Sequence, residues 1–252
     1  EVYMFPCLAD NYGFLLHDNE NNLTAAIDTP DAKKINEMLA FKKWKLTHIL
    51  NTHHHFDHSG GNEELKLKWN CHIVGALKDV HRIHGVDFAV SDNQVFDFGN
   101  HQIKVLEVPG HTSGHIAFYI SSAKIAFVGD TVFSLGCGRL FEGTASELFE
   151  SISKLSQLPD ETLFYCGHEY TASNAKFALS VDPNNCLLME YAEKITRLRS
   201  ENLPTIPTTL AHEKMVNPFL RANDENLKKV LGMEYCSSVE VLAELRSRKD
   251  EF

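Results

Sequence analysis

The run His53-His54-His55-Phe56-Asp57-His58 follows an apolar segment at 47–51 and precedes Gly60-Gly61. A short apolar segment predicts a buried β-strand, and the paired glycines can open the next helix. We therefore expect the run on a strand-to-helix loop, where neighbouring side chains can converge on one point. A continuous helix would separate them, because helical residues two apart point to different faces.

The run has the residue types of a metal site. Neutral imidazoles and carboxylates suit a borderline divalent ion such as zinc, and more weakly iron or manganese. A histidine-rich polar loop would explain a single histidine, but the H-x-H-x-D-H spacing between a strand and a Gly-Gly pair favours ligation. Because one ion that keeps a position open for water cannot use every candidate, the ligands indicate two ions.

Three further ligand candidates each lie beside a glycine just after a predicted strand: His111, Asp130 and His168. A polar residue in such a place is usually a turn former. Three of them in addition to the first run indicate that other strand ends complete the site.

The chain divides by pattern into two parts. Up to about residue 164, short β-rich segments alternate with turns and occasional helices, which predicts mixed sheet with helices on its faces. Thr29 is a candidate helix cap with Pro30 in the first turn, and Thr144 with Glu147 forms a capping box. The predicted strands lie at 13–16, 25–28, 47–51, 72–75, 103–108, 116–120, 125–128 and 162–166.

After residue 166 the apolar residues follow helical spacing, so we expect a small helical domain. Proline-containing stretches at 203–207 and 217–218 should connect its helices. The expected helices include residues 177–179, 187–198, 227–231 and 239–245.

Composition limits the partners. The chain has 24 basic and 34 acidic residues, a formal charge of −10, which argues against nucleic acid because phosphate backbones require a basic face. No apolar run approaches the roughly 18 residues of a membrane helix, and no signal region opens the sequence. We expect a cytoplasmic monomer without membrane contact. The six scattered cysteines are expected to be mostly buried thiols.

The ligand-bearing loops, in their order along the chain, resemble those of the metallo-β-lactamase superfamily over roughly residues 1–170. The resemblance implies an α/β (α+β) fold, an αββα sandwich at 1–168 followed by a helical substrate-binding domain at 169–252. His54 and His115 are expected to support or pack against the site without binding metal. By the resemblance one ion is held by His53, His55 and His111, the other by Asp57, His58 and His168, and Asp130 bridges both.

Two such ions would lower the pKa of a water between them to about neutrality or below, giving a bridging hydroxide as nucleophile. One ion would also polarise a substrate carbonyl and stabilise the charge that develops on its oxygen. Asp57 is the catalytic candidate, because its carboxylate can orient the hydroxide by accepting a hydrogen bond. The site therefore predicts hydrolysis.

The segments 7–12, 136–144, 166–171 and 245–250 resemble glyoxalase II, the hydroxyacylglutathione hydrolase family, and this likeness spans nearly the whole chain. It implies hydrolysis of S-D-lactoylglutathione and related 2-hydroxyacylglutathione thioesters to glutathione and D-lactate or the corresponding acid. This is the second step of methylglyoxal detoxification. The residues that the resemblance assigns to the glutathione thioester are Arg139, Phe141, Tyr170, Arg246 and Lys249.

Two of these positions depart from the pattern. Arg139 stands where some relatives have lysine, so the charge is kept. Phe141 stands where they have tyrosine, and the missing hydroxyl is worth on the order of 1 kcal/mol. We expect the choice of thioester to survive and the affinity for glutathione to be affected.

Two alternatives come from other classes of protein. One is an iron-dependent glutathione persulfide dioxygenase on the same fold, disfavoured by the full two-metal ligand set and the long helical domain. The other is a non-catalytic, metal-stabilised interaction module, which would be expected to lose a ligand. The ligands accept zinc, iron or manganese, and we expect zinc.

Overall fold

The computed structural model describes residues 1–252. By its contacts the chain forms two compact units. The first unit comprises Glu1–Glu107 and Ser113–Gly129, and the second comprises Val108–Thr112 and Asp130–Phe252.

The first unit contains two groups of strands. One is a six-stranded sheet in the order β1-β2-β3-β4-β5-β6, antiparallel from β1 to β3 and parallel from β3 to β6. The other runs β7-β8-β9-β10 with antiparallel neighbours. Their strands are β1 (Val2–Cys7), β2 (Asn11–Asp18), β3 (Leu23–Ile27), β4 (His48–Leu50), β5 (His72–Ala76), β6 (Phe88–Val90), β7 (Val95–Phe98), β8 (His101–Glu107), β9 (Ile116–Ile120) and β10 (Ile125–Gly129).

The two groups of strands face each other across a buried layer. The ring of Phe14 on β2 lies 5.6 Å from the ring of Phe127 on β10, and both side chains are buried. Every residue of β9 and β10 is buried, as expected for strands covered on both faces.

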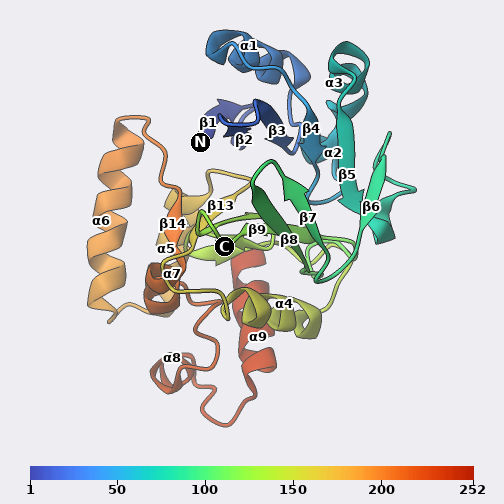
Figure 1. Cartoon of the computed structure of the whole chain (residues 1–252). Coiled ribbons are helices and arrows are strands. Elements are labelled where there is room, and N and C mark those ends of the chain that lie inside the picture. Colours follow the sequence, from blue (N-terminus) through green and yellow to red (C-terminus); the bar gives the residue numbers. More distant parts are fainter. The chain divides into compact units, whose positions relative to one another are not determined.

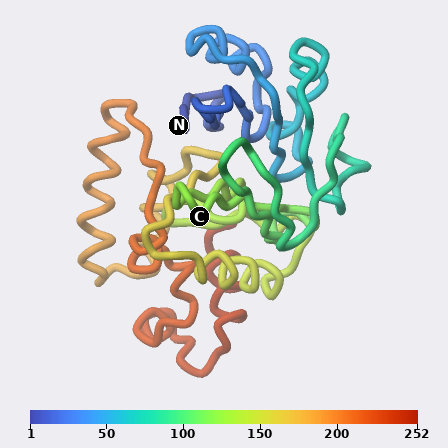
Figure 2. The backbone as a smooth tube through the Cα atoms, in the orientation of Figure 1, coloured from blue at the N-terminus to red at the C-terminus, as the bar shows by residue number.

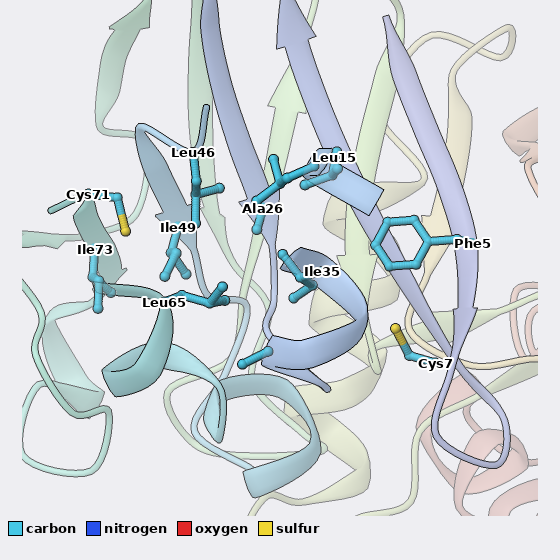
Figure 3. Close-up of a cluster of buried hydrophobic side chains, with 12 residues drawn as sticks. Phe5, Cys7, Leu15, Ala26, Ile35, Leu46, Ile49, Leu65, Cys71 and Ile73 are labelled. Carbon is cyan, nitrogen blue, oxygen red and sulfur yellow. The ribbon is translucent and has the colours of Figure 1, made fainter. Parts of the chain in front are cut away.

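Helices α1 (Ala32–Lys42) and α3 (Asn62–Trp69) lie on the side of the first sheet away from β7–β9 (Figure 1). Ile35 of α1 and Leu65 of α3 point to the sheet, where they pack in one cluster with residues such as Ile49 (Figure 3). All three are fully buried, and burial of such a side chain contributes about 1.5–3 kcal/mol. The unit also contains the short helices α2 (Phe56–Ser59) and η1 (Leu77–Asp79).

The second unit is mainly helical. Its α6 and α7 appear in orange and its α8 and α9 in orange to red in Figure 2. Leu135 packs with helical residues such as Leu188 and Ile195 in its core. The elements are the hairpin of β11 (Val132–Phe133) and β12 (Gly136–Cys137), α4 (Ala145–Leu155), the pair of β13 (Leu163–Cys166) and β14 (Thr208–Thr209), then α5 (Thr171–Val181), α6 (Cys186–Ser200), α7 (Leu210–Val216), α8 (Glu225–Leu231) and α9 (Ser238–Glu251).

The predicted strands are confirmed with shifts of a few residues at their ends, and the expected helical stretches fall within α5, α6, α8 and α9. The capping box is also confirmed, since Thr144 and Glu147 each bond to the other's backbone amide. The elements that were not predicted are the helix α7 and the strands β1, β6, β7, β11, β12 and β14. No helix is long and apolar enough to cross a bilayer.

Two local predictions are wrong in detail. The first helix is capped by Asp31, not by Thr29, because the Asp31 side chain accepts from the Lys34 amide at 3.0 Å. Thr29 instead donates to Asn62 at 2.7 Å inside the protein. The ligand run is not entirely loop, because Phe56–Ser59 forms one helical turn before α3.

The six cysteines are all free. Cys7, Cys71, Cys137 and Cys166 are buried, as expected, whereas Cys186 is exposed and Cys236 is half-buried.

Candidate metal centre

The first unit carries four predicted ligands between β4 and α3. Nε2 of His53 lies 3.1 Å from Nδ1 of His55, so two imidazole nitrogens already face one another. The His53 ring lies 4.1 Å from that of His58. These four residues, His53, His55, Asp57 and His58, form what we call the first half-site.

The buried carboxylate of Asp28 orients two of these rings. It accepts from Nδ1 of His58 at 2.9 Å and from the Thr52 hydroxyl at 2.8 Å. Because the Thr52 hydroxyl donates to Asp28, its oxygen accepts from Nδ1 of His53, which is 3.0 Å away. The hydrogen-bond network thus assigns the Nδ1–H tautomer to both histidines and leaves each Nε2 with a lone pair.

The backbone at Asp28 is itself unusual, with φ 58, the left-handed region that non-glycine residues seldom adopt. This conformation accompanies a bond from the Thr52 amide to the Asp28 carboxylate at 2.7 Å. A residue stays in this strained conformation only where surrounding contacts hold it there, and such residues are often found at functional sites.

Asp57 lies at the start of the one-turn helix α2. Its Oδ2 accepts from Nδ2 of Asn11 at 3.1 Å and lies 3.5 Å from Nε2 of His58. The Asn11 amide also donates to the Asp57 backbone carbonyl at 3.2 Å. Asn11 therefore fixes both the backbone and the side chain of this carboxylate.

His54 and His115 have other neighbours. Nδ1 of His54 lies 3.4 Å from the fully buried carboxylate of Asp79, and its Nε2 lies 3.4 Å from the Arg82 guanidinium. His115 is fully buried and its ring stacks on that of His53 at 4.7 Å. Gly129 leaves room for it, since a Cβ there would lie 2.7 Å from the His115 ring.

The second unit carries the other three predicted ligands, His111, Asp130 and His168, which we call the second half-site. Oδ2 of Asp130 lies 3.6 Å from Nε2 of His111 and 3.3 Å from Nε2 of His168. Nδ1 of His111 lies 2.9 Å from the Arg139 carbonyl, which can only accept, so this histidine also has its proton on Nδ1. All three side chains are buried.

Aromatic rings flank these histidines. The Tyr170 ring lies parallel to that of His168 at 4.7 Å, and Phe133 contacts both. The Phe141 ring meets that of His111 edge-on at 5.2 Å, and 62% of the phenylalanine is exposed. Tyr170 and Phe141 thus adjoin predicted ligands while part of each remains accessible.

The predicted cationic contacts differ in exposure. The Arg139 side chain is 62% exposed, with Nε 3.4 Å from the Asp250 carboxylate. Arg246 is buried, donating to the Cys137 carbonyl at 2.9 Å and to the same Asp250 carboxylate at 2.9 Å. Lys249 donates to the Ser173 hydroxyl at 3.1 Å.

The surroundings of Lys249 and the buried thiols affect their protonation. Burial, with the charges of Arg246 and Arg139, holds the pKa of Lys249 below its ordinary value. Burial raises the pKa of Cys137 to about 11 and that of Cys166 to about 12. Both thiols are therefore neutral at physiological pH, and neither provides a thiolate ligand or nucleophile.

The donor set fits divalent metal ions. In His53, His58 and His111 the Nδ1–H group donates a hydrogen bond to an oxygen, so Nε2 presents a lone pair. A carboxylate lies beside Nε2 of His58 and beside Nε2 of His111. This is how proteins prepare imidazoles for a cation of zinc type. Each of the seven predicted ligands belongs to a group of His and Asp side chains that could hold a metal ion.

The sequence reading missed the orienting residues Asn11, Asp28, Thr52 and Asp79. Asp28 was the last residue of a predicted strand, but it lacks the neighbouring glycine that was part of the pattern at Asp130. Nothing in the sequence paired it with His58, because they meet only through folding.

Two protein-family models match adjacent segments of this chain. The profile of the metallo-β-lactamase superfamily matches residues 28–168, and one described as the C-terminus of hydroxyacylglutathione hydrolase matches residues 169–252. A hydroxyacylglutathione hydrolase of Maricaulis maris is 51% identical over 251 residues, covering 100% of this chain and 98% of the relative. One of Rhizobium meliloti is 48% identical over 252 residues, with the same coverages.

Solved structures show the same fold at lower identity. The B3 metallo-β-lactamase BLEG-1 is 21% identical with a TM-score of 0.67, covering 87% of this chain and 99% of that one. ETHE1 from Myxococcus xanthus is 23% identical with a TM-score of 0.68, covering 99% of this chain and 98% of that one. The chain thus has the metallo-β-lactamase fold and its metal-binding His/Asp residues.

Proposed function

Because the chain belongs to the hydroxyacylglutathione hydrolase family within the metallo-β-lactamase superfamily, we propose that it hydrolyses S-D-lactoylglutathione and related 2-hydroxyacylglutathione thioesters. The products are glutathione and D-lactate or the corresponding acid. The observation that carries this proposal is the identity of 51% over 251 residues, which includes the helical C-terminal segment.

We further propose that the two half-sites together hold two divalent ions, zinc in preference to iron or manganese. When bound, the ions would acidify a water molecule and polarise the thioester carbonyl. The tautomers assigned to His53, His58 and His111 support this ligand role. One ion is assigned to His53, His55 and His111, the other to Asp57, His58 and His168, and Asp130 to both.

Asp57 has the second proposed role, orienting the attacking water by accepting its hydrogen bond. The side-chain amide of Asn11 donates to this carboxylate at 3.1 Å, so the carboxylate is already positioned before substrate binds. Such prior positioning lowers the entropic cost of reaching the reactive geometry.

We assign the glutathione portion to Arg139, Phe141, Tyr170 and Lys249. Glutathione carries carboxylates, which arginine can hold bidentately and lysine can attract as a compact charge. Arg246 belongs to the same group, but its burial and its hydrogen bonds to Cys137 and Asp250 suit it to holding the other residues in place.

The proposal includes a catalytic domain at 1–168, a helical substrate-binding domain at 169–252, a monomer and a cytoplasmic location. The family matches to 28–168 and 169–252 support the boundary. Six free cysteines support a reducing compartment.

The test is turnover of S-D-lactoylglutathione by the metal-loaded protein and its Asp57→Ala variant. We expect the variant to lose roughly 10²- to 10⁴-fold in kcat, the range for a positioned proton acceptor. Asp97→Ala, on the exposed part of β7, is the matched control and should keep wild-type turnover. Unchanged turnover in Asp57→Ala would remove the role assigned to this carboxylate.

An oxygen test separates hydrolysis from the dioxygenase alternative. The same assay without oxygen should proceed at an unchanged rate, because hydrolysis consumes only water. Loss of the rate, or oxygen consumption with glutathione persulfide, would contradict the proposed function.

A further inference from the structure

A buried carboxylate on α7 serves no ligand or substrate role assigned above. Glu213 is fully buried, and no arginine or lysine pairs with it among its hydrogen bonds. Four neutral donors surround it instead. They are the Ser134 hydroxyl at 3.0 Å, the Leu135 amide at 2.8 Å, the Thr208 hydroxyl at 2.8 Å and the Asn217 amide at 2.9 Å.

Two of these donors form the turn of the β11–β12 hairpin. Asn217 donates in addition to the carbonyls of Phe133 and Gly136, each at 3.1 Å, so all four residues from 133 to 136 are tied to Glu213 or Asn217. Leu135 itself has φ 60. A leucine stays in this left-handed region only where its surroundings hold it there.

The hairpin ends at the second half-site. Asp130 precedes β11 by two residues, and after β12 the Gly138 amide donates to the Thr131 carbonyl at 3.3 Å. The next residue, Arg139, provides the carbonyl that fixes the His111 tautomer. Phe133, inside the hairpin, contacts the rings of His168 and Tyr170. Each of the three ligands of this half-site therefore touches, or is connected to, the hairpin.

We propose that Glu213 is a positioning residue for the metal centre, acting through the hairpin on Asp130, His111 and His168. Oε2 accepts from the Leu135 and Asn217 amides, which can only donate, whereas Oε1 faces the hydroxyls of Ser134 and Thr208, which can donate or accept. An acceptor at the Oε2 position is therefore what the hairpin requires. The helical segment then has a role beyond binding substrate, because it holds the metal ligands in place. This inference rests on the metal site of the proposed function and adds a residue that touches neither metal nor substrate.

The test measures zinc binding by the full-length, metal-free protein in competition with a chromophoric chelator. Glu213→Met keeps the length of the side chain but removes both acceptors, so the Leu135 and Asn217 amides lose the oxygen that they share. We expect its zinc affinity to fall roughly 10- to 100-fold, the usual cost of losing an orienting partner. The absorption spectrum of the cobalt-loaded variant should change as well, since its ligand geometry changes.

Two variants separate positioning from general loss of stability. Glu213→Asp keeps both acceptors and should recover part of the zinc affinity. Leu227→Ala removes a fully buried side chain from α8, away from the hairpin, and should lower the melting temperature without changing the affinity. If Glu213→Met binds zinc as tightly as wild type, or Leu227→Ala loses as much affinity, the inference is overturned.

A milder change covers the case in which Glu213→Met does not fold. Ser134→Ala removes one of the four donors and should weaken zinc binding in the same direction by a smaller factor; unchanged affinity in Ser134→Ala would overturn the inference. Because zinc binding needs no substrate, its outcome is independent of thioester turnover. Wild-type protein that binds zinc but does not hydrolyse S-D-lactoylglutathione would contradict the proposed function alone.

Discussion

Oδ2 of Asp28 lies 2.9 Å from Nδ1 of His58, while the same carboxylate receives two bonds from Thr52. One buried side chain thus orients His58 directly and His53 through Thr52. It provides in the first unit what the Arg139 carbonyl provides for His111 in the second. Imidazoles with a fixed tautomer bind metal without first having to reorganise.

We expect Asp28→Asn to weaken metal binding roughly 10- to 100-fold, because an amide has one acceptor oxygen for three donors. Competition with a chelator measures this affinity. Asp31→Asn is the control, since asparagine also caps helices and α1 should be unaffected. Wild-type affinity in Asp28→Asn would mean that His53 and His58 do not depend on this carboxylate.

Restoring a hydroxyl at position 141 should tighten the binding of substrate. The Phe141 ring is exposed beside His111, so Phe141→Tyr adds a donor without disturbing the core. A gain of about 1 kcal/mol corresponds to a KM lower by roughly fivefold, with kcat unchanged. Phe41→Tyr, on the exposed face of α1, is the control for adding a hydroxyl elsewhere. An unchanged KM would show that position 141 does not reach glutathione.

Lys249→Ala should raise KM for the glutathione thioester and leave kcat nearly unchanged. The amine forms hydrogen bonds only to Ser173 and lies near the exposed Arg139. Steady-state kinetics at two salt concentrations would measure the effect, which should shrink at high salt because ionic attraction is screened. A fall in kcat at constant KM would contradict a binding role.

Arg246→Ala should behave differently and mainly lower stability. The buried guanidinium donates to Cys137 and Asp250 and lies 5.5 Å from the Phe219 ring. Loss of these contacts should cost roughly 2–3 kcal/mol, measurable by urea unfolding. If stability is unchanged and only KM rises, Arg246 contacts substrate directly, as the sequence resemblance implied.

Stability should also fall at mildly acidic pH. Burial, with the neighbouring His72, holds the pKa of His48 below 6.5. The unfolded chain therefore takes up a proton that the folded state resists, so this part of the stability is present above pH 6.5 and is lost as the pH falls below it. Urea unfolding of metal-free His48→Gln should show a smaller loss between pH 7 and pH 5 than wild type. An equal loss would assign the effect to other histidines.

Local patterns in the sequence predicted much of this fold. The apolar runs at 116–120 and 125–128 coincide with β9 and β10, because strands buried on both faces need nearly continuous apolar residues. The capping box of α4 could also be predicted from local sequence, since Thr144 and Glu147 lie within four residues. The cap at Asp31 was misplaced because Thr29 has the same chemistry, and only the contact with Asn62 distinguishes them.

The residues that could bind metal were recognisable in the sequence, because ligand chemistry belongs to the side chain and its place after a strand follows from the apolar pattern. The orientation of those ligands depends on contacts that exist only in the folded chain. Asp28 reaches His58 across 30 positions, and Glu213 reaches Ser134 across 79. Such hydrogen bonds leave no periodic trace in the sequence, since they form only when folding has buried both partners and excluded the water that would otherwise satisfy them.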